Sequence, residues 1–462
     1  MTAAQRLAAF ASELDLAQIP DHVREAAKLH LLDTLGCGLA AHALDTAPAA
    51  REAMAELGGI GPSTAIGVPT GLSAHDAALV NGATCHALDF DDTHPGAVSH
   101  VSVAVAPAAI ATAEALGLSG EDLLVALIAG NELTARIGLA ASEDFHARGF
   151  HPTAVCGVFG AAAAVARLRE LDATATTRAL GIAGSLAAGL LEFLADGSST
   201  KRLHPGFAAH AGVIAAALAA HGATGPATVL EGRFGVYRAF LGRDDVDIEA
   251  QLDDLGTRWE TPRIAFKPYP ACHYVHAPLD ATVAAMSEEG LEVDAIDELV
   301  LVSPPAGVPM VLEPAEAKAR PRSEYEAKFS LPYSVASYLV RGPVDVMSYT
   351  DEAIGDEQVL ELAGRVRYEV KDYDTAGRAF PGGVRIRTRD GRVVERELRH
   401  QRGDAENPMS DAEVLDKFAA NASLALEDSD RETLTAAVVA FDRQPDLSAL
   451  RLLAGARRRV PA

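Results

Sequence analysis

A chain of 462 residues with 49% hydrophobic and 23% charged residues has the composition of an ordinary globular protein, and its length predicts two domains. The net charge of −24 at pH 7 argues against a nucleic-acid-binding protein and against binding to anionic membranes, because both need a basic face. A small acidic ligand remains compatible with this charge if a few Lys, Arg and His side chains gather locally.

The cysteines and the N-terminus bear on the cellular compartment. Four cysteines lie far apart in the sequence, which predicts neither a disulfide framework nor a CxxC-type zinc site. The N-terminal stretch MTAAQRLAAFASELD predicts an amphipathic helix rather than a signal peptide. Gly, His, Asp or Arg interrupts each apolar run, so no membrane-spanning segment is expected. We therefore expect a soluble, cytoplasmic protein.

Helical periodicity dominates residues 3–240. A long helix is expected to open at Pro20, and the Gly- and Pro-rich segment 58–71 is expected to form a loop. Ala-rich segments that are apolar almost all round predict closely packed central helices. These predicted helices cover Ser73–Asn81, Val103–Leu116, Gly120–Ala141, Ala154–Glu170, Ala173–Leu191 and Ala208–His221.

The pattern changes to mixed helices and strands near residues 262–278. The segment VRIRTRDGRVVERELRH predicts a hairpin that turns at Asp390-Gly391, and the helical pattern resumes at Ser410, which with Glu413 predicts a capping box. The other elements expected here are helices at Pro278–Glu289, Tyr325–Arg341 and Asp351–Ala363, and extended segments at Glu298–Ser303 and Val366–Lys371.

These elements predict a mostly α fold with a large, discontinuous all-helical domain and a smaller α+β lid domain. We place the helical domain at residues 1–266 with 404–462, and the lid domain at residues 267–403. Fourteen of the fifteen histidines lie at or before His276. Any histidine chemistry is therefore expected in the helical domain and in the hinge that follows it.

The segment His86–His94, HALDFDDTH, places two histidines and three aspartates inside apolar sequence. Three interpretations compete for it. Asp89, Asp91 and Asp92 could wrap around a divalent cation, the segment could be an acid/base site, or it could be a polar turn that ends a helix. The Mg²⁺-diphosphate interpretation normally needs a second aspartate-rich motif, and none is obvious in the sequence.

Further polar clusters follow at residues 94–100, 148–153, 196–206, 266–276 and 328–333. For each of them an ordinary loop, cap or surface role competes with a role in binding or catalysis. Taken together, however, they place the cations Lys201, Arg202, Lys267 and Lys328 among Gly, Pro and His residues in a strongly acidic chain. Such a set is what a protein needs to bind a polycarboxylate and to move a proton on it.

Six motifs occur in order along the chain: HALDFDDTH, GFHPT, SSTKRLHPG, KPYPACHYVHAPLDA, EAKFSLPYSVA and GDAENPMSDAEVLDKF. With them the chain resembles the MmgE/PrpD family, which includes 2-methylcitrate dehydratase, cis-aconitate decarboxylase and an iminodisuccinate epimerase. The resemblance implies a helical domain and an α+β lid with the active site between them, a homodimer, and no metal or organic cofactor.

The clusters and the resemblance together assign roles to individual residues. The predicted catalytic residues are Asp89, His100, His151, Lys267 and Tyr333, and the predicted substrate-binding residues are Thr93, Lys201, Arg202, His204, Cys272 and His273. The chain also departs from two patterns of the family. Cys272 stands where the decarboxylases have a histidine, and the tryptophan-containing insert of dedicated 2-methylcitrate dehydratases is missing after Thr93.

The expected function is cofactor-independent chemistry on a small di- or tricarboxylate, beginning with proton abstraction next to a carboxylate. We expect a lyase similar to 2-methylcitrate dehydratase, with an iminodisuccinate-type epimerase or a cis-aconitate-type decarboxylase as the alternatives within the family. Outside the family, the alternatives are a Mg²⁺-dependent helical lyase and a helical binding scaffold. No nucleic-acid or membrane partner is expected.

Overall fold

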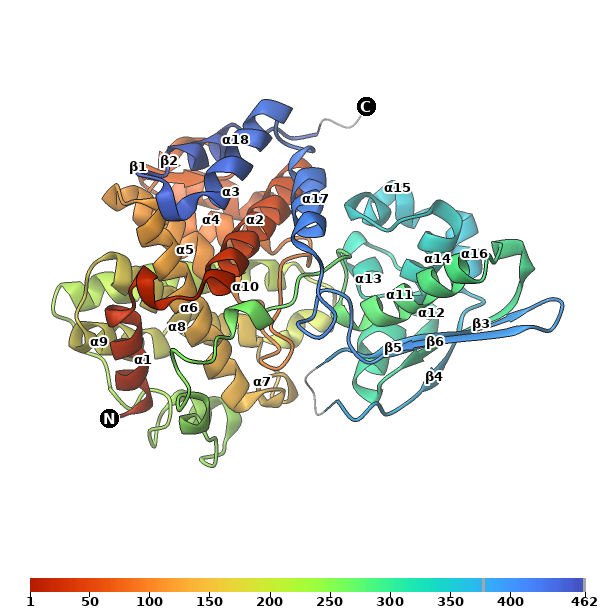
Figure 1. Ribbon diagram of the computed structural model, residues 1–462, viewed down its shortest axis with the longest axis horizontal. Helices are drawn as coiled ribbons and strands as arrows, with labels where there is room; N and C mark the ends of the chain where they lie inside the picture. The colour runs from red at the N-terminus through yellow and green to blue at the C-terminus, as the bar shows by residue number, and fades with distance from the viewer. Residues whose placement is uncertain (376–378, 460–462) are drawn as a thin grey trace. The chain divides into compact units, whose positions relative to one another are not determined.

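The computed structural model describes residues 1–375 and 379–459, and the chain divides into two compact units. Unit 1 comprises residues 1–87, 91–266 and 410–462, and unit 2 comprises residues 88–90 and 267–409. Residues 404–409 and the short segment 88–90 thus belong to unit 2, whereas we expected both in the helical domain. The described residues are mostly helical with two small sheets (Figure 1), which confirms the predicted fold class.

Unit 1 is built from helices that pack through small side chains. Helix α8 (Pro152–Leu168) lies against α5 (Ser102–Leu116), α6 (Gly120–Ala141) and α10 (Thr200–Ala220). A Cβ atom on Gly212 of α10 would lie 2.5 Å from the Cβ of Ala161 in α8, so these two backbones approach too closely for a larger residue. The remaining helices are α1 (Ala3–Glu13), α2 (Asp21–Ala43), α3 (Pro48–Leu57), α4 (Ala74–Cys85), α7 (Asp144–Ala147), α9 (Ala173–Gly184), α17 (Asp411–Ala422) and α18 (Asp428–Val439).

Segment 58–71 is not the loop that its composition predicts. It contains strand β1 (Ile60–Ala65), which pairs antiparallel with β2 (Val68–Leu72). The register shifts twice along this pairing, so the strands do not alternate regularly, and glycines and two prolines conceal them in the sequence.

Two predicted helices of unit 1 have different bounds in the structure. Helix α9 ends at Gly184 rather than continuing to residue 191, and α10 begins at Thr200 rather than at residue 208. The first turns of α10 therefore carry Lys201 and His204, which we expected in a Gly-rich loop. A Cβ on Gly206 would lie 2.5 Å from the carbonyl oxygen of Leu79 in α4, so close helix packing explains why the Pro205-Gly206 sequence remains helical.

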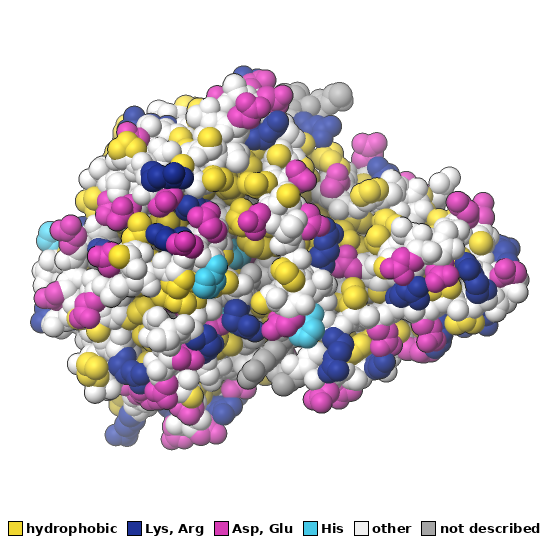
Figure 2. All heavy atoms as spheres, viewed as in Figure 1, with side chains coloured by type: hydrophobic (Ala, Val, Ile, Leu, Met, Phe, Trp, Pro, Cys, Tyr) yellow, Lys and Arg dark blue, Asp and Glu magenta, His cyan; other side chains and the backbone are white. Residues whose placement is uncertain are grey.

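Helices α6 and α10 are long and apolar enough to cross a membrane by length and composition, which the sequence analysis did not expect. In unit 1, however, 89% of the apolar stretch of α6 and 56% of that of α10 are buried inside the protein. Core helices of soluble proteins share these properties. Over the described residues on the face shown in Figure 2, acidic and basic side chains are interspersed.

Unit 2 contains a four-stranded sheet in the order β4-β3-β5-β6, in which β3 and β4 are parallel and the other pairs antiparallel. Helix α11 (His273–Glu288) packs against β5 and β6. The predicted hairpin at Asp390-Gly391 is confirmed, because β5 and β6 pair on either side of it. The strands are β3 (Ile296–Ser303), β4 (Arg367–Val370), β5 (Gly382–Thr388) and β6 (Val393–Leu398).

Two single helices that we predicted in unit 2 are each divided. Residues 325–341 form α13 (Glu324–Lys328) and α14 (Leu331–Arg341), because the side chain of Ser330 accepts a hydrogen bond from the amide of Tyr333 and begins a new helix. Residues 351–363 form α15 (Asp351–Ile354) and α16 (Glu357–Ala363), with Asp356 as the second cap. Among the described residues of unit 2, the remaining α-helix is α12 (Ala315–Ala319).

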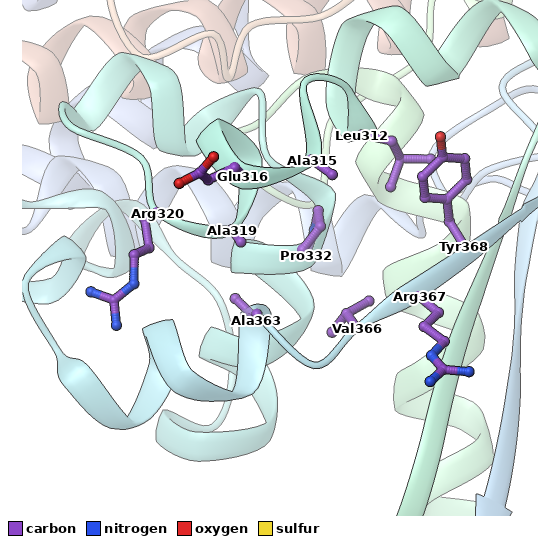
Figure 3. Close-up of a pocket in the computed structure, with 11 residues that line it drawn as sticks. Leu312, Ala315, Glu316, Ala319, Arg320, Pro332, Ala363, Val366, Arg367 and Tyr368 are labelled. Carbon is purple, nitrogen blue, oxygen red and sulfur yellow. The ribbon is translucent and has the colours of Figure 1, made fainter.

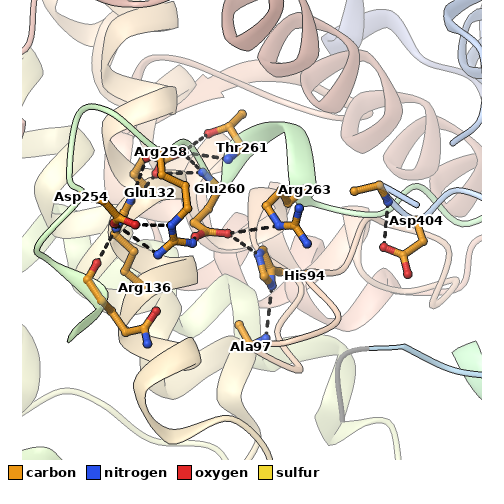
Figure 4. Close-up of polar contacts among 12 residues, drawn as sticks. His94, Ala97, Glu132, Arg136, Asp254, Arg258, Glu260, Thr261, Arg263 and Asp404 are labelled. Atoms are coloured by element: carbon orange, nitrogen blue, oxygen red, sulfur yellow. Dashed lines mark hydrogen bonds and ion pairs between the residues drawn. The ribbon is translucent and has the colours of Figure 1, made fainter. Parts of the chain in front are cut away.

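A buried ionic network fixes segment 254–263 of unit 1 against α6 (Figure 4). The Glu132 carboxylate accepts hydrogen bonds from the backbone amides of Glu260 and Thr261, each at 2.8 Å at the shortest. Arg136, one turn along the helix, donates to Asp254 at 2.8 Å. Glu260 in turn lies 3.0 Å from the imidazole Nε2 of His94. The network therefore anchors the segment that begins at His94.

Candidate active site

The segment between α4 and α5 carries the residues that the sequence analysis emphasised. His86 ends α4 as its C-cap residue, and the chain then folds back through a short pairing of His94 with Ser99 before α5 begins at Ser102. Val98 has a φ of 50°, a left-handed conformation that a β-branched residue rarely adopts. Backbone strain of this kind is common at functional sites. Here the strained residue lies two positions before His100.

Asp91 is a fully buried carboxylate that holds two histidines. Its Oδ2 atom lies 2.9 Å from Nδ1 of His86 and 2.9 Å from Nδ1 of His100. The two imidazole rings meet edge to face, with centroids 4.6 Å apart. Asp91 was not among the predicted site residues, but it lies at the centre of a charged cluster.

Thr93 lies beside this cluster. Its Oγ1 is 3.2 Å from the same Nδ1 of His100, and its backbone pairs with Ala265 through two hydrogen bonds of 2.9 and 2.8 Å. The backbone amide of His100 donates to the Thr153 hydroxyl at 3.0 Å, which ties His100 to the first turn of α8. The predicted site residues Thr93 and His100 are thus brought together with the N-terminus of α8.

His151 is the N-cap residue of α8, directly before Pro152, as the sequence indicated. Its Nδ1 lies 3.0 Å from Nδ1 of His204 in α10, and its ring stacks on His86 with centroids 5.7 Å apart. The rings of His100 and His151 have centroids 6.3 Å apart. Four histidines from distant parts of the sequence therefore form one buried group with Asp91.

Burial and positive charge set the protonation of this group. Burial is the largest influence that lowers the pKa of His86, of His146 and of His204, each to about 4. Burial, followed by the charge of Lys201, places the pKa of His151 well below its ordinary value. Burial opposes ionisation of Asp91, yet the charges and hydrogen bonds of His100 and His86 hold the pKa of Asp91 well below its usual range. His86, His151 and His204 are thus neutral imidazoles near an ionised carboxylate.

Lys201 provides the positive charge near these histidines. Its side chain is buried, and its charge lowers the pKa of His86, His146, His151 and His204. A buried ammonium among neutral imidazoles is a suitable partner for a substrate carboxylate. Arg202, the neighbouring predicted cation, donates instead to the carbonyl oxygen of Thr46 at 2.6 Å.

Asp92 has a different set of partners from Asp91. Its Oδ2 lies 2.9 Å from Nδ1 of His30, and its Oδ1 accepts from the amide of Ser102 at the start of α5. The other ring nitrogen of His30, Nε2, lies 3.2 Å from the Thr261 carbonyl oxygen. Asp92 therefore connects α2, α5 and segment 254–263.

In unit 2, Asp89 and Lys267 form a buried ion pair. The ammonium of Lys267 donates to the backbone carbonyl of Asp89 at 2.8 Å and to its Oδ1 at 3.2 Å. Asp89 has a φ of 53°, and this left-handed backbone turns its carbonyl and its carboxylate toward the same cation. The two predicted catalytic residues are brought together, each at most 2% exposed.

The other predicted residues of unit 2 are buried in ordinary contacts. The Cys272 amide donates to the Lys328 carbonyl at 2.9 Å, and the His273 ring stacks on Phe380 with centroids 4.8 Å apart. The Tyr333 hydroxyl donates to the Ser348 carbonyl at 2.7 Å, and burial raises the pKa of this phenol to about 12. The catalytic role of Tyr333 stays a prediction.

A separate cavity of about 370 Å³ lies in unit 2 (Figure 3). Its lining includes Arg320 and Arg367, which already pair with Glu357 and Glu298, each at 3.1 Å. Most of the remaining lining is apolar. The cavity therefore lacks the uncompensated positive charge that a polycarboxylate needs.

The three aspartates of HALDFDDTH do not converge on one point. Asp89 faces Lys267, Asp91 faces His86 and His100, and Asp92 faces His30. Within the described residues, the buried group that could hold a metal is His86, Asp91 and His100, and both Nδ1 atoms of that group are already bonded to the carboxylate. The partners of the aspartates favour an acid/base cluster over a trio of magnesium ligands.

His86, Asp91 and His146 also belong to the cluster, and none of the three was predicted from the sequence as a site residue. Asp91 had one usable signal, a carboxylate between two histidines in apolar sequence. His146 is five residues before His151, and its ring centroid lies 6.5 Å from that of His151. No helical or strand period relates these positions, because loops bring them together.

Unit 1 thus holds a buried group of histidines around one aspartate, side-chain types that can exchange protons. The chain matches the MmgE/PrpD N-terminal domain over residues 5–249 and the MmgE/PrpD C-terminal domain over residues 269–443. It therefore belongs to the MmgE/PrpD family, and the resemblance drawn from its motifs is confirmed.

Relatives with an assigned activity match almost the whole chain. Cis-aconitate decarboxylase of Homo sapiens is 32% identical over 95% of this chain and 92% of its own length. Cis-aconitate decarboxylase of Mus musculus is 33% identical over 82% of this chain and 78% of its own length. Cis-aconitate decarboxylase of Aspergillus terreus is 29% identical over 96% of this chain and 93% of its own length. These similarities support an enzyme.

Proposed function

We propose that this chain is a lyase that decarboxylates a small unsaturated tricarboxylate of the cis-aconitate type, without a metal or organic cofactor. The observation that carries the proposal is the buried cluster of His86, Asp91, His100, His151 and His204 beside Lys201. The names of the full-length relatives supply the substrate class. Dehydration of 2-methylcitrate, which we expected first, becomes the second candidate.

The proposed reaction needs one proton donor and one cation. The carbon–carbon bond to the departing carboxylate breaks, CO₂ leaves, and the electron pair stays on the carbon skeleton. A remaining carboxylate and the neighbouring double bond delocalise this charge. An imidazolium then adds a proton to carbon, so that the product carries one carboxylate fewer and one hydrogen more.

The described side chains suit these steps. The Lys201 ammonium compensates charge on a substrate carboxylate, and a well-placed cation of this kind contributes about 3 kcal/mol to stabilising the transition state. His100 is the proton donor of the proposal, because its Nδ1 lies 2.9 Å from Oδ2 of Asp91 and this contact orients the ring. His151 and His204 form the neutral pair that takes up or returns a proton.

Dehydration is the second candidate because of one feature of unit 2. Cys272 stands where the decarboxylases of the family have a histidine, and its side chain is buried. In a dehydration, an imidazole would remove the proton next to a carboxylate and a second group would protonate the departing hydroxyl. The same cluster supports both reactions, so the products distinguish them.

A substrate panel tests the proposal. Purified protein at high concentration is incubated separately with cis-aconitate, 2-methylcitrate, citrate and iminodisuccinate, and products are identified by NMR with parallel measurement of released CO₂. We expect CO₂ and an unsaturated dicarboxylate from cis-aconitate. Water loss from 2-methylcitrate without CO₂ release from cis-aconitate would favour the second candidate, and no turnover of any polycarboxylate would favour a binding scaffold.

We also propose a homodimer, as the family resemblance implies, and a cytoplasmic location, as the scattered cysteines and the N-terminal pattern indicate. Equilibrium sedimentation of the purified chain tests the dimer. A single species with the mass of one 48.2 kDa chain at micromolar concentration would contradict it.

A further inference from the structure

Asp91 can serve only as an acceptor for its two imidazole partners. An ionised carboxylate has no proton to donate, and the pKa of Asp91 lies well below its usual range. The Nδ1 atoms of His86 and His100, each 2.9 Å away, must therefore both carry a hydrogen. The tautomer of each ring follows from this geometry without any reference to substrate.

The consequence for His100 is specific. Because Nδ1 donates to Asp91, the nitrogen that can exchange a proton with another molecule is Nε2. The Thr93 hydroxyl, 3.2 Å from the same Nδ1, can only accept a second branch of that hydrogen bond. The Thr93 hydroxyl hydrogen is thereby directed away from the ring.

His86 completes the arrangement from the other side of the carboxylate. Its Nδ1 lies 3.0 Å from Oδ1 and 2.9 Å from Oδ2 of Asp91, so this nitrogen is within hydrogen-bond distance of both carboxylate oxygens. Its Nε2 is buried and has no hydrogen-bond partner among the described residues. A neutral imidazole buried at this cost is explained if its Nδ1–H orients the carboxylate.

Other titratable groups also face this pair of rings. His146 and His151 interact electrostatically with His100, and Lys201 acts on His86. Lys417 of α17 and the thiols of Cys37 and Cys85 interact with Asp91. Asp91 is the carboxylate bonded to both His86 and His100. Replacing Asp91 is therefore expected to change His100 in a way that changes at the other groups do not.

We propose that Asp91 and His86 are positioning residues that fix His100 with Nδ1 protonated and present Nε2 as its proton-transferring nitrogen. The inference rests on the proposed function for its catalytic meaning, although the tautomer itself does not. Asp91 is the central member, because its carboxylate bonds directly to His100. His86 acts through Asp91 and contributes less.

Asp92 provides a matched control. It is adjacent in sequence, it is equally buried, and its Oδ2 also lies 2.9 Å from a histidine Nδ1, but that histidine is His30 rather than His100. Asp92→Asn therefore removes the same charge from the same loop without touching His100. We expect both Asn variants to lose stability, and only Asp91→Asn to change the behaviour of His100.

The first readout needs no substrate. In ¹⁵N-histidine-labelled protein, the signals of His100 are those lost in His100→Gln, and solid-state ¹⁵N NMR reports which nitrogen is protonated. We expect protonated Nδ1 in the wild type and in Asp92→Asn, and a mixed or Nε2-protonated ring in Asp91→Asn. An unchanged His100 tautomer in Asp91→Asn would overturn the proposal, whether or not the protein turns over any polycarboxylate.

The second readout is kinetic. Asp91→Asn is expected to lower kcat about 10²–10⁴-fold with KM changed less than about threefold, the range for loss of general acid–base catalysis. The pH profile of kcat/KM is expected to shift in Asp91→Asn, because that variant removes the buried negative charge that lies against His100. His86→Asn keeps a donor near Nδ1 and should retain far more activity than His86→Leu. Equal losses in His86→Asn and His86→Leu, or an unmoved profile in Asp91→Asn, would contradict positioning.

The two readouts separate the two failures. A wild-type protein with the expected tautomer and no turnover contradicts the proposed function and leaves positioning supported. Turnover with a His100 tautomer that is independent of Asp91 contradicts positioning and leaves the function supported.

Discussion

The Nδ1 atoms of His151 and His204 lie 3.0 Å apart, so one imidazole donates to the other and the pair shares a single hydrogen between them. Two cations could not occupy this arrangement, and burial lowers the pKa of both rings. The relationship joins the start of α8 to the first turns of α10. The motifs GFHPT and TKRLH, which lie far apart in the sequence, therefore supply the two histidines of one hydrogen-bonded pair.

This pair of histidines predicts that His151→Ala loses turnover while the protein remains folded. Loss of one acid–base partner is expected to lower kcat about 10²–10⁴-fold. The control is His210→Ala. It removes a different histidine, on α10, whose Nδ1 lies 3.0 Å from the His75 carbonyl oxygen. Kinetics and thermal melting of both variants provide the measurement. A large fall in melting temperature for His151→Ala, with kcat of the remaining folded protein unchanged, would assign His151 a structural role.

The lowered pKa values predict a stability that depends on pH. The pKa of His86 and of His204 is about 4 in the folded chain, against an ordinary value of 6.5. Between pH 6.5 and pH 4 the unfolded chain therefore binds protons that the folded chain does not, and each histidine lowers the free energy of unfolding by about 1.4 kcal/mol per pH unit as pH falls. Asp33 and Asp280, whose pKa values burial raises to about 6, act in the opposite direction.

Variants isolate the histidine contribution from these acids. Urea unfolding at pH 7, 6, 5 and 4 should show that the stability difference between the wild type and His204→Gln shrinks toward pH 4. A difference that stays constant across this range would show that folding does not lower the pKa of His204.

The buried ion pair of unit 2 predicts non-additive stability losses. Lys267→Met or Asp89→Asn leaves the partner group without its buried counterpart and is expected to cost about 3–5 kcal/mol. The double variant should lose less than the sum of the single losses by about 1 kcal/mol or more. Lys371→Met, at an exposed pair with Glu397 in the same unit, should cost less than about 1 kcal/mol. Strict additivity in urea unfolding would show that Lys267 and Asp89 do not stabilise each other.

The separate partners of Asp89, Asp91 and Asp92 predict that chelation leaves turnover unchanged. The protein is dialysed against EDTA and assayed with cis-aconitate, with and without added Mg²⁺ or Zn²⁺. Loss of activity on chelation followed by recovery with Mg²⁺ would instead support the metal-dependent lyase.

The sequence predicted elements whose signals are local. The Ser410–Glu413 capping box and the Asp390-Gly391 turn are confirmed, because a few neighbouring residues determine them. The predicted start of α10 at residue 208 was wrong. Pro205 and Gly206 indicate a loop in the sequence, whereas tertiary packing on α4 keeps them helical. Local composition cannot report a contact between distant helices.

The site shows the same division. The motifs pointed to His100, His151, Lys201 and His204, and the structure gathers these residues in unit 1. The motifs did not reveal that Asp91 links His86 to His100. That contact depends on a chain reversal with a positive φ at Val98, which no pattern in residues 86–100 predicts.

The central claim is that the histidine–aspartate cluster of unit 1 transfers a proton to the carbon skeleton of a polycarboxylate. The most direct measurement is ¹H and ²H NMR of cis-aconitate incubated in D₂O with the wild type and with His100→Gln. We predict that the wild type releases CO₂ and gives a product with one solvent deuterium on carbon, and that His100→Gln, still folded, forms it at least about 100-fold more slowly. Absence of CO₂ release and of deuterium incorporation with the wild type would contradict the account.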